Sequence, residues 1–340
     1  MAASPRISVT MPCYDCGRTV AGALDSLLAQ EGADFEVVAV DDGSTDDTAG
    51  ILAEYARRDS RVRVFSIPHG GVIRAANAAI GAARGIYIAR MDADDEALPG
   101  RLALQAALLD DHPDVGLVGC RVRFGGSRRT CRGYAHYVDW TNSLLSHEAI
   151  SLHRFVEFPV PNPSIMFRRD CLEAHGPYRE GDFPEDYDLL LRWLEGGVRM
   201  MKADAELLVW NDPPDRLSRT HPRYDVDAFY RIKTEYLARW LARNNPHHPV
   251  VHILGSGRTT RKRADLLLAH GIEFAAYYDV DPKKIGHRVH GLPVRDRAEI
   301  PAPGEGFCIP YVASRGAREE IAVFLEGRGC RLGRDYIPAA

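Results

Sequence analysis

"GGVIRAANAAIGAARGIYIARMDADD", residues 70–95, joins an amphipathic helix to a short apolar strand that ends in a group of aspartates. Ile73, Ala76 and Ile80 recur at helical spacing, and the β-rich run "IYIARM" follows at residues 86–91. A helix that leads directly into a buried strand is the crossover of a parallel βαβ unit. The stretch therefore predicts a parallel α/β sheet with carboxylates at the carboxyl end of one strand.

The same alternation of strand and helix patterns extends over the N-terminal third of the chain. The β-rich runs predict strands at residues 7–11, 35–40, 62–67, 86–91 and 115–124. Between the first two strands, the apolar stripe of a helix that lies on a sheet is formed by Val20, Leu24, Leu27 and Leu28. We expect an α/β fold with a mixed, mainly parallel sheet flanked by helices.

Beyond residue 124 the alternation is less regular, and it restarts near the C-terminus. The Pro-rich segment 158–170 predicts a loop that enters a strand, and residues 184–197 and 227–244 have helical patterns. The predicted domains are a main domain at 1–222 with halves at about 6–124 and 125–222, a helix and linker at 223–246, and a small α/β domain at 247–340.

Composition places the chain among ordinary globular proteins. The 340 residues are 45% hydrophobic and 26% charged, and the formal net charge of −4 gives no support for nucleic-acid binding. The sequence shows neither a signal peptide nor a stretch of about 18 apolar residues that could cross a membrane. Seven cysteines, an odd number, predict free thiols in a reducing compartment, and we expect a cytoplasmic protein.

The aspartates after residue 91 are distinguished by their position. The D-x-D pattern occurs four times in the chain, and Asp225 with Asp227 simply begins a helix. Asp92 and Asp94, with Asp95 beside them, instead follow a strand that we expect to be central. Ligands of open parallel sheets bind at the carboxyl ends of strands, and carboxylates are ligands that Mg²⁺ or Mn²⁺ prefers. We therefore expect a divalent-metal site there, completed by a nucleotide diphosphate.

Three motifs in order, "ISVTMPCYD", "EVVAVDDGSTDDT" and the opening stretch, resemble the nucleotide-sugar-binding half of the family 2 glycosyltransferases, which have a GT-A fold. The resemblance is close over about 7–124 and looser to about 220. It implies a nucleotide-sugar site at Pro12, Tyr14, Asp41, Arg74, Asn77 and Asp92, and metal ligands at Asp94 and Asp95. Asp15 departs from the pattern, since the family often has asparagine there.

The second half resembles the acceptor side of the same family. "FPEDYDLLLRW" resembles a Glu-Asp motif at a helix start, which implies that Asp186 is the general base and that Glu185 orients the acceptor or the metal. The resemblance also implies acceptor or diphosphate contacts at Asn162, Trp210, Arg216, Arg219 and His221. An ordinary helix start and a solvated basic loop are the alternatives.

The small C-terminal domain resembles a Rossmann-like module. Gly255 and Gly257 follow one strand and Asp279 follows the next, but Thr260 replaces the third glycine of the dinucleotide fingerprint. A structural or partner-binding role is therefore favoured over nucleotide binding.

Together these patterns predict an inverting, metal-dependent glycosyltransferase that uses Mn²⁺ or Mg²⁺. The resemblance implies a UDP-sugar as the favoured donor. It also implies a glycan or lipid-linked hydroxyl as the acceptor, in surface polysaccharide synthesis, at the inner membrane face if a membrane is involved. A sugar-1-phosphate nucleotidyltransferase is an alternative, although residues 12–17 lack the Gly-rich, Arg-bearing loop and the lysine that it needs. A nonenzymatic nucleotide-binding scaffold is another. Assembly into homo-oligomers is left open.

Overall fold

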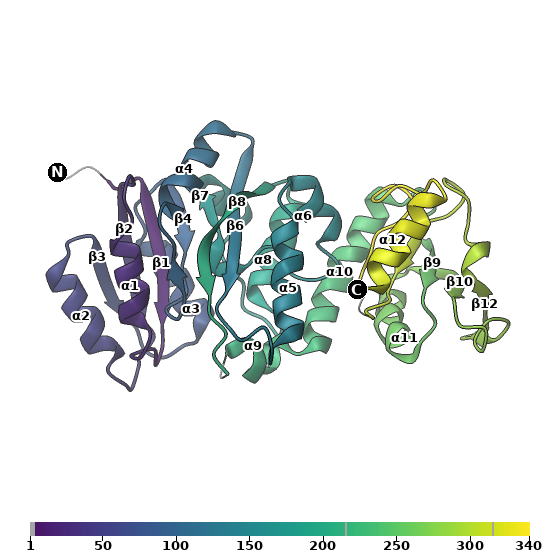
Figure 1. Cartoon of the computed structure of the whole chain (residues 1–340), viewed down its shortest axis with the longest axis horizontal. Helices are drawn as coiled ribbons and strands as arrows, with labels where there is room; N and C mark the ends of the chain where they lie inside the picture. The colour runs from purple at the N-terminus through teal and green to yellow at the C-terminus, as the bar shows by residue number, and fades with distance from the viewer. Residues whose placement is uncertain (1–3, 215, 315) are drawn as a thin grey trace. The chain divides into compact units, whose positions relative to one another are not determined.

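The computed structural model describes residues 4–214, 216–314 and 316–340. Its internal contacts divide the chain into two compact units. The first comprises Met1–Ile150 and Val160–His221, and the second comprises Ser151–Pro159 and Pro222–Ala340. Figure 1 shows the elements of both units in chain order. Among the described residues, no helix has the length and apolarity that crossing a membrane requires.

The first unit is built on an eight-stranded sheet with the strand order β3-β2-β1-β4-β7-β6-β8-β5. Its strands are β1 (Ile7–Cys13), β2 (Phe35–Asp41), β3 (Val62–Ser66), β4 (Tyr87–Arg90), β5 (Glu96–Ala97), β6 (Val115–Phe124), β7 (Met166–Arg168) and β8 (Arg199–Trp210). The short strands β5 and β7 pair antiparallel with their neighbours, and the remaining pairs are parallel. The predicted mixed, mainly parallel α/β sheet is confirmed.

Helices cover both faces of this sheet, which explains why successive residues of β2 are apolar on both faces. On β2, Val37 and Ala39 belong to the main core, whereas Val38 and Val40 form a second cluster with Ala75 and other residues of α3. The helices up to the end of the first unit are α1 (Val20–Leu28), α2 (Thr48–Arg58), α3 (Val72–Ala82), α4 (Arg101–Asp111), α5 (Arg132–Ser143), α6 (His147–His153), α7 (Arg169–His175), α8 (Glu185–Glu195) and α9 (Leu217–Thr220).

The register of the parallel strands brings three strand ends to one edge of the sheet. Cys13 of β1 pairs with Asp41 of β2, and Thr10 of β1 pairs with Arg90 of β4. The backbone N–H of Met91 continues this pairing by donating to the carbonyl of Thr10 at 3.1 Å. The loops that follow β1, β2 and β4 therefore lie side by side.

The second unit contains a five-stranded sheet with the order β11-β12-β10-β9-β13, in which only β11 is antiparallel to its neighbour. Its elements are α10 (Val226–Asn244), β9 (Val250–Leu254), α11 (Arg258–Ala264), β10 (Glu273–Asp279), β11 (Arg288–Val289), β12 (Leu292–Asp296), β13 (Cys308–Pro310) and α12 (Ala317–Gly327). The contacts place α10 in this unit.

Candidate active site

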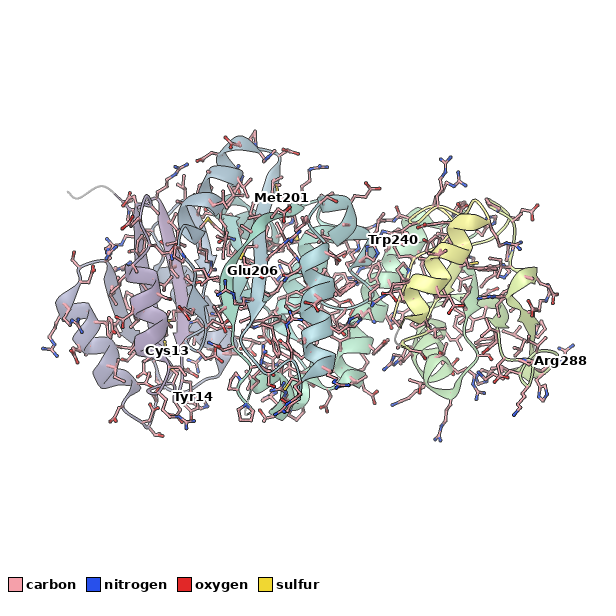
Figure 2. All side chains as sticks on the ribbon, in the orientation of Figure 1. Cys13, Tyr14, Met201, Glu206, Trp240 and Arg288 are labelled. Carbon is pink, nitrogen blue, oxygen red and sulfur yellow. The ribbon has the colours of Figure 1, made fainter. Side chains whose placement is uncertain are left out.

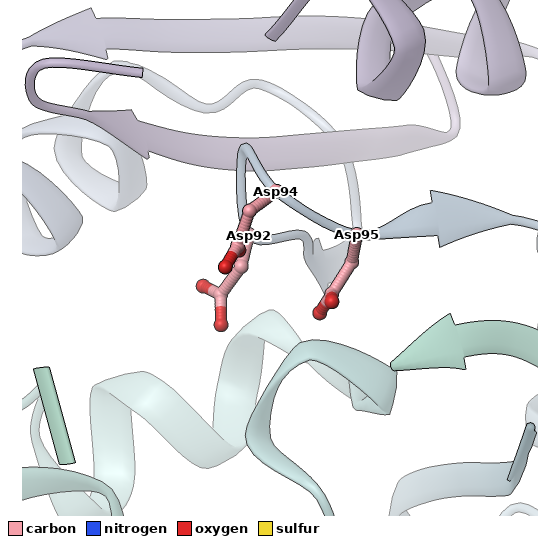
Figure 3. A group of neighbouring side chains, drawn as sticks. All are labelled: Asp92, Asp94 and Asp95. Atoms are coloured by element: carbon pink, nitrogen blue, oxygen red, sulfur yellow. The ribbon is translucent and has the colours of Figure 1, made fainter. Parts of the chain in front are cut away.

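Three aspartates that follow β4 bring their carboxylates together before β5. Asp92, Asp94 and Asp95 each offer a carboxylate oxygen, and these oxygens lie within 4.8 Å of one another. Their side chains point to the same side of the loop (Figure 3). The structure thus brings together the three aspartates that were selected from the sequence because they follow a strand. Such a group has the chemistry of a site for a hard divalent cation.

Burial and mutual repulsion raise the pKa of two of these carboxyl groups. Burial and the charge of Asp92 raise the pKa of Asp94 to about 6. Asp95 is 3% exposed, and burial together with both neighbours raises its pKa well above the ordinary value. Asp95 Oδ1 accepts from the backbone N–H of Asn211 at 2.8 Å, but its buried Oδ2 has no hydrogen-bond partner among the described residues. A bound cation would relieve both the repulsion and the unpaired oxygen.

The segment after β8 lies against this cluster. Asn211 Nδ2 donates to the carbonyl of Asp94 at 2.7 Å. The guanidinium of Arg216 lies over the rings of Tyr134 and Trp210, at 4.8 and 4.9 Å from their centroids. Its charge acts to lower the pKa of Asp94, against the larger effect of burial. Arg216 therefore supplies a positive charge beside the aspartates, on an aromatic support.

Two further candidates from this segment are more exposed. Arg219 donates to Asp212 Oδ1 at 2.6 Å, and the same oxygen lies 3.5 Å from Arg216. The Asp212 side chain is buried, so it anchors both arginines. His221 is exposed and follows α9.

An exposed aromatic pair joins the loop after β1 to the loop between β3 and α3. Tyr14 is 46% exposed, and its ring packs on that of His69 with centroids 4.2 Å apart. Cys13 and Tyr14 are at the carboxyl end of β1 (Figure 2), and Pro12 lies within the strand. The pair offers a flat apolar surface of the kind on which a nucleobase stacks.

Two aspartates at the end of β2 are buried. Asp41 Oδ1 accepts from the backbone N–H of Ser44 at 3.1 Å. Asp42 is 1% exposed and accepts from the N–H groups of Gly70 and Gly71 at 2.9 and 2.8 Å. Sequence analysis did not identify Asp42, which holds the loop that leads into α3.

Asp15 occupies a backbone position that suits either aspartate or asparagine. Its φ of +46° lies in the left-handed region, which aspartate and asparagine tolerate better than other side chains do. Its N–H donates to Ser44 Oγ at 3.0 Å, and its Oδ1 accepts from the N–H of Thr45 at 2.7 Å. Asp15 therefore joins the loops after β1 and β2.

The two predicted contacts from α3 differ in their surroundings. Arg74 is exposed. Asn77 is half-buried and its Nδ2 donates to the carbonyl of Tyr178 at 2.9 Å, whereas its buried Oδ1 has no partner among the described residues. Asn77 thus contacts the segment that precedes α8.

The helix α8 begins with the Glu-Asp pair. Glu185 is buried, and Asp186 Oδ1 accepts from the backbone N–H of Tyr187 at 2.7 Å. Burial, followed by the charges of Glu185 and Asp92, raises the pKa of Asp186 to about 8. The influence of Asp92 shows that the Glu-Asp pair and the aspartate cluster share one electrostatic environment.

Two neighbours of this pair are tied to other side chains. Asp188 is fully buried and forms ion pairs with Arg179 and Arg192. Asn162 Oδ1 accepts from the hydroxyl of Tyr178 at 2.9 Å. Asp188 therefore stabilises the structure around α8, and Asn162 lies next to a tyrosine that interacts with Asp186.

Arg90, the last residue of β4, is also absent from the sequence-based candidates. Its side chain is 5% exposed, and its NH2 group donates to Asp92 Oδ1 at 2.5 Å. The sequence does indicate Arg90, because a charged residue is unusual inside a β-rich run such as "IYIARM".

Two of the seven cysteines form a pair that was not recognised in the sequence. All seven cysteines are free thiols, as predicted. Treating each one singly overlooked that Cys13 and Cys16 have C-x-x-C spacing. The interaction between their thiols lowers the pKa of Cys16 and, together with burial, raises that of Cys13.

Comparison with known sequences finds a family and related bacterial proteins. Residues 8–176 match the sequence profile of Glycosyl transferase family 2. The "Uncharacterized glycosyltransferase EpsJ" of Bacillus subtilis is 37% identical over 247 residues, which cover 69% of this chain and 69% of EpsJ. The "Uncharacterized protein y4gI" of Sinorhizobium fredii is 34% identical over 255 residues, which cover 71% of this chain. The match spans only 26% of y4gI itself.

Solved structures share the fold. TarS of S. aureus, crystallised as residues 1–349 with UDP-GlcNAc, has a TM-score of 0.52 at 19% identity over 71% of this chain and 74% of that one. The mannosyltransferase PcManGT of Pyrobaculum calidifontis, in complex with GDP-Man and Mn²⁺, has a TM-score of 0.51 at 19% identity over 80% of this chain and 70% of that one. These likenesses agree with the predicted GT-A fold.

Proposed function

This chain belongs to glycosyl transferase family 2, and we propose that it is an inverting, metal-dependent enzyme that transfers a sugar from a nucleoside-diphosphate donor to an acceptor hydroxyl. Family membership favours glycosyl transfer over the nucleotidyltransferase alternative. The acceptor that we propose is a glycan or a lipid-linked sugar in surface polysaccharide synthesis, as the family resemblance implies.

The aspartate cluster is the observation that carries this proposal. Asp92, Asp94 and Asp95 would hold Mn²⁺ or Mg²⁺, because their oxygens converge and one of them is buried without a partner. When bound, such an ion stabilises the charge of a departing diphosphate. The Mn²⁺ of PcManGT supports this assignment. Arg216 adds positive charge beside the same cluster.

The loops after β1 and β2 are the proposed site of the nucleoside. Tyr14 and His69 present a stacking surface for the base, and Asp41 at the neighbouring strand end has the acceptor oxygens to bind its edge. Arg74 and Asn77 of α3 are the other proposed contacts. The donors in TarS and PcManGT, UDP-GlcNAc and GDP-Man, support a nucleotide sugar, and we favour a UDP-sugar.

Asp186 is the proposed general base. An acceptor hydroxyl is a weak nucleophile, so a carboxylate must take its proton as the oxygen attacks the anomeric carbon. A single displacement of this kind inverts the configuration of that carbon. Glu185 and Asn162 lie beside Asp186 or its neighbour Tyr178 and are proposed to orient the acceptor.

Replacing one aspartate tests the proposed metal site. Asp94→Asn keeps the size of the side chain but removes its charge, so we expect the affinity for UDP in the presence of Mn²⁺ to fall at least about 100-fold. Isothermal titration calorimetry of the full chain with UDP, with and without Mn²⁺, measures this loss.

The matched control is Asp227→Asn. Asp227 also belongs to a D-x-D pair, but it is exposed on α10 and pairs with Lys262. The control should bind UDP and Mn²⁺ as the unmodified protein does. An Asp94→Asn variant that binds as tightly as the control would exclude Asp94 as a ligand.

A further inference from the structure

Arg90 is a buried charge with unused hydrogen-bonding capacity. Its NH2 group donates to Asp92 Oδ1, but Nε and NH1 are buried and have no hydrogen-bond partner among the described residues. A guanidinium has five N–H donors, and burying them unpaired costs free energy. Native proteins pair almost all such groups. The unpaired N–H groups of Arg90 therefore indicate that a bound molecule, and not the chain itself, accepts hydrogen bonds from them.

Arg90 is a cation, because a guanidinium group stays protonated in proteins. The open N–H groups thus belong to a cation, and hydrogen bonds donated by a cation are stronger than those between neutral groups.

The neighbours of Arg90 indicate where its unpaired N–H groups lie within the proposed site. Asp92 belongs to the proposed diphosphate and metal side, whereas Glu185 begins the helix that carries the proposed base. In the proposed reaction the transferred sugar must lie between those two sides, because its anomeric carbon is bonded to the diphosphate and attacked from the opposite face. Arg90 donates to Asp92 on the first side, and the charge of Glu185 on the second side acts on its guanidinium.

We propose that Arg90 recognises the sugar itself, with Nε and NH1 donating hydrogen bonds to two oxygen atoms of the glycosyl group that is transferred. This inference rests on the proposed function, and it adds to it a residue that distinguishes the sugar nucleotide from the bare nucleotide. Sugars fit the site chemically because they present several oxygens that can accept hydrogen bonds. Arg90 is then a specificity residue, while the nucleoside and the cation are bound by other side chains.

The test compares sugar nucleotides with their nucleotides in the full-length protein. Calorimetry in Mn²⁺ gives the affinities for UDP, GDP, UDP-GlcNAc, UDP-glucose and GDP-mannose, and release of UDP or GDP gives kcat/KM for donor hydrolysis. In Arg90→Lys and Arg90→Gln we expect the affinity for the bare nucleotide to stay within about threefold. We expect kcat/KM for the best donor, and its affinity relative to the bare nucleotide, to fall about 10-fold to 100-fold, as for the loss of hydrogen bonds to a charged group.

Arg63→Lys is the matched control. Arg63 of β3 also pairs with a buried carboxylate, that of Glu36, at 2.8 Å. This variant should leave both measurements unchanged. Retained binding of UDP with Mn²⁺ reports that each Arg90 variant is folded.

Four results would overturn the inference in different ways. Equal losses for UDP and for the sugar nucleotide would mean that Arg90 serves only to hold Asp92. Unchanged hydrolysis and relative affinity in both Arg90 variants would remove any role in recognition. An unmodified protein that binds equally to a sugar nucleotide and its nucleotide would overturn this inference alone. One that neither binds nor hydrolyses any of these sugar nucleotides would overturn the proposed function as well, and that result requires no variant.

Discussion

Asp186 lies in surroundings that favour its protonated form. Burial and the charge of Glu185 raise its pKa to about 8, so at neutral pH the isolated site holds a proton that a general base must lose. Asp92 contributes in the same direction. A cation bound at the aspartates would offset the charge of Asp92 and so lower the pKa of Asp186. Under the proposed function, binding at the donor site would then favour the ionised form of the proposed base.

The pH dependence of turnover tests this coupling. The proposed base acts when ionised, so kcat should rise with pH through the pKa of Asp186 and then level off. The negative charge of Glu185 opposes that ionisation. Glu185→Gln should therefore move the acidic limb of the kcat profile down by about one pH unit. The measurement is kcat between pH 5.5 and 9 at saturating donor and Mn²⁺.

Asp186→Asn provides the reference for that profile. It should lower kcat about 100-fold or more and remove the acidic limb, while donor binding is retained. An acidic limb that stays in place in Glu185→Gln, or persists in Asp186→Asn, would assign the limb to a different group.

At the scale of elements, α4 fixes the end of β4. Arg101 is fully buried, and its NH2 group donates to the carbonyls of Arg90 and Pro163, each at 2.6 Å. Gln105, one turn later, donates to the carbonyls of Val118 and Ser164 at 2.9 and 2.7 Å. One helix thereby holds the strand end from which the aspartates project.

Removing the arginine of α4 should therefore destabilise the first unit. Arg101→Met leaves buried carbonyl groups without donors, which should reduce the free energy of unfolding by about 2 to 5 kcal/mol. Urea unfolding followed by circular dichroism measures the change. The control on the same helix is Leu104→Gln, an exposed position where we expect a change within about 0.5 kcal/mol. Similar losses in both variants would contradict a specific role for Arg101.

The same scale shows which elements the sequence could predict. The strands at the N-terminal end follow a regular alternation, and the structure has them. The strand β8 was not predicted, because its pairing with β6 shifts register near Cys120 and Arg121. This shift interrupts the two-residue period by which a strand is recognised. The helix α5 was not predicted either. Its aromatic residues, such as Tyr134 and Trp140, hide the helical spacing of the few residues that are buried. The aspartates after β4 were predictable from their strand exit, and the family resemblance indicated Arg216. Asn211 was not predictable, because its bonds to Asp94 and Asp95 join segments distant in sequence.

At the scale of the whole molecule, the chain presents two places where a nucleotide could be expected. In the second unit, Asp279 is the last residue of β10, but its Oδ2 already accepts from the N–H and hydroxyl of Ser256, at 2.9 and 2.5 Å. These bonds and Lys284 lower the pKa of Asp279 to about 2, so its carboxylate is committed within the unit. The first unit instead has an aspartate cluster with an unpaired oxygen. Donor binding is therefore favoured in the first unit, against a scaffold that binds through its C-terminal part.

Hydrogen exchange of the full chain distinguishes donor binding in the first unit from nucleotide binding in the second. We expect UDP with Mn²⁺ to slow exchange of the backbone amides at 12–17, 41–46 and 92–97, because a bound donor suppresses local opening of the loops that contact it. Amides at 254–260 and 279–284 should exchange as before. The Asp94→Asn variant serves as the control, since it should lose the protection in the presence of the same ligands. Protection of 254–260 and 279–284 that persists in this variant would instead place the nucleotide in the second unit and leave the aspartates of the first without their proposed partner.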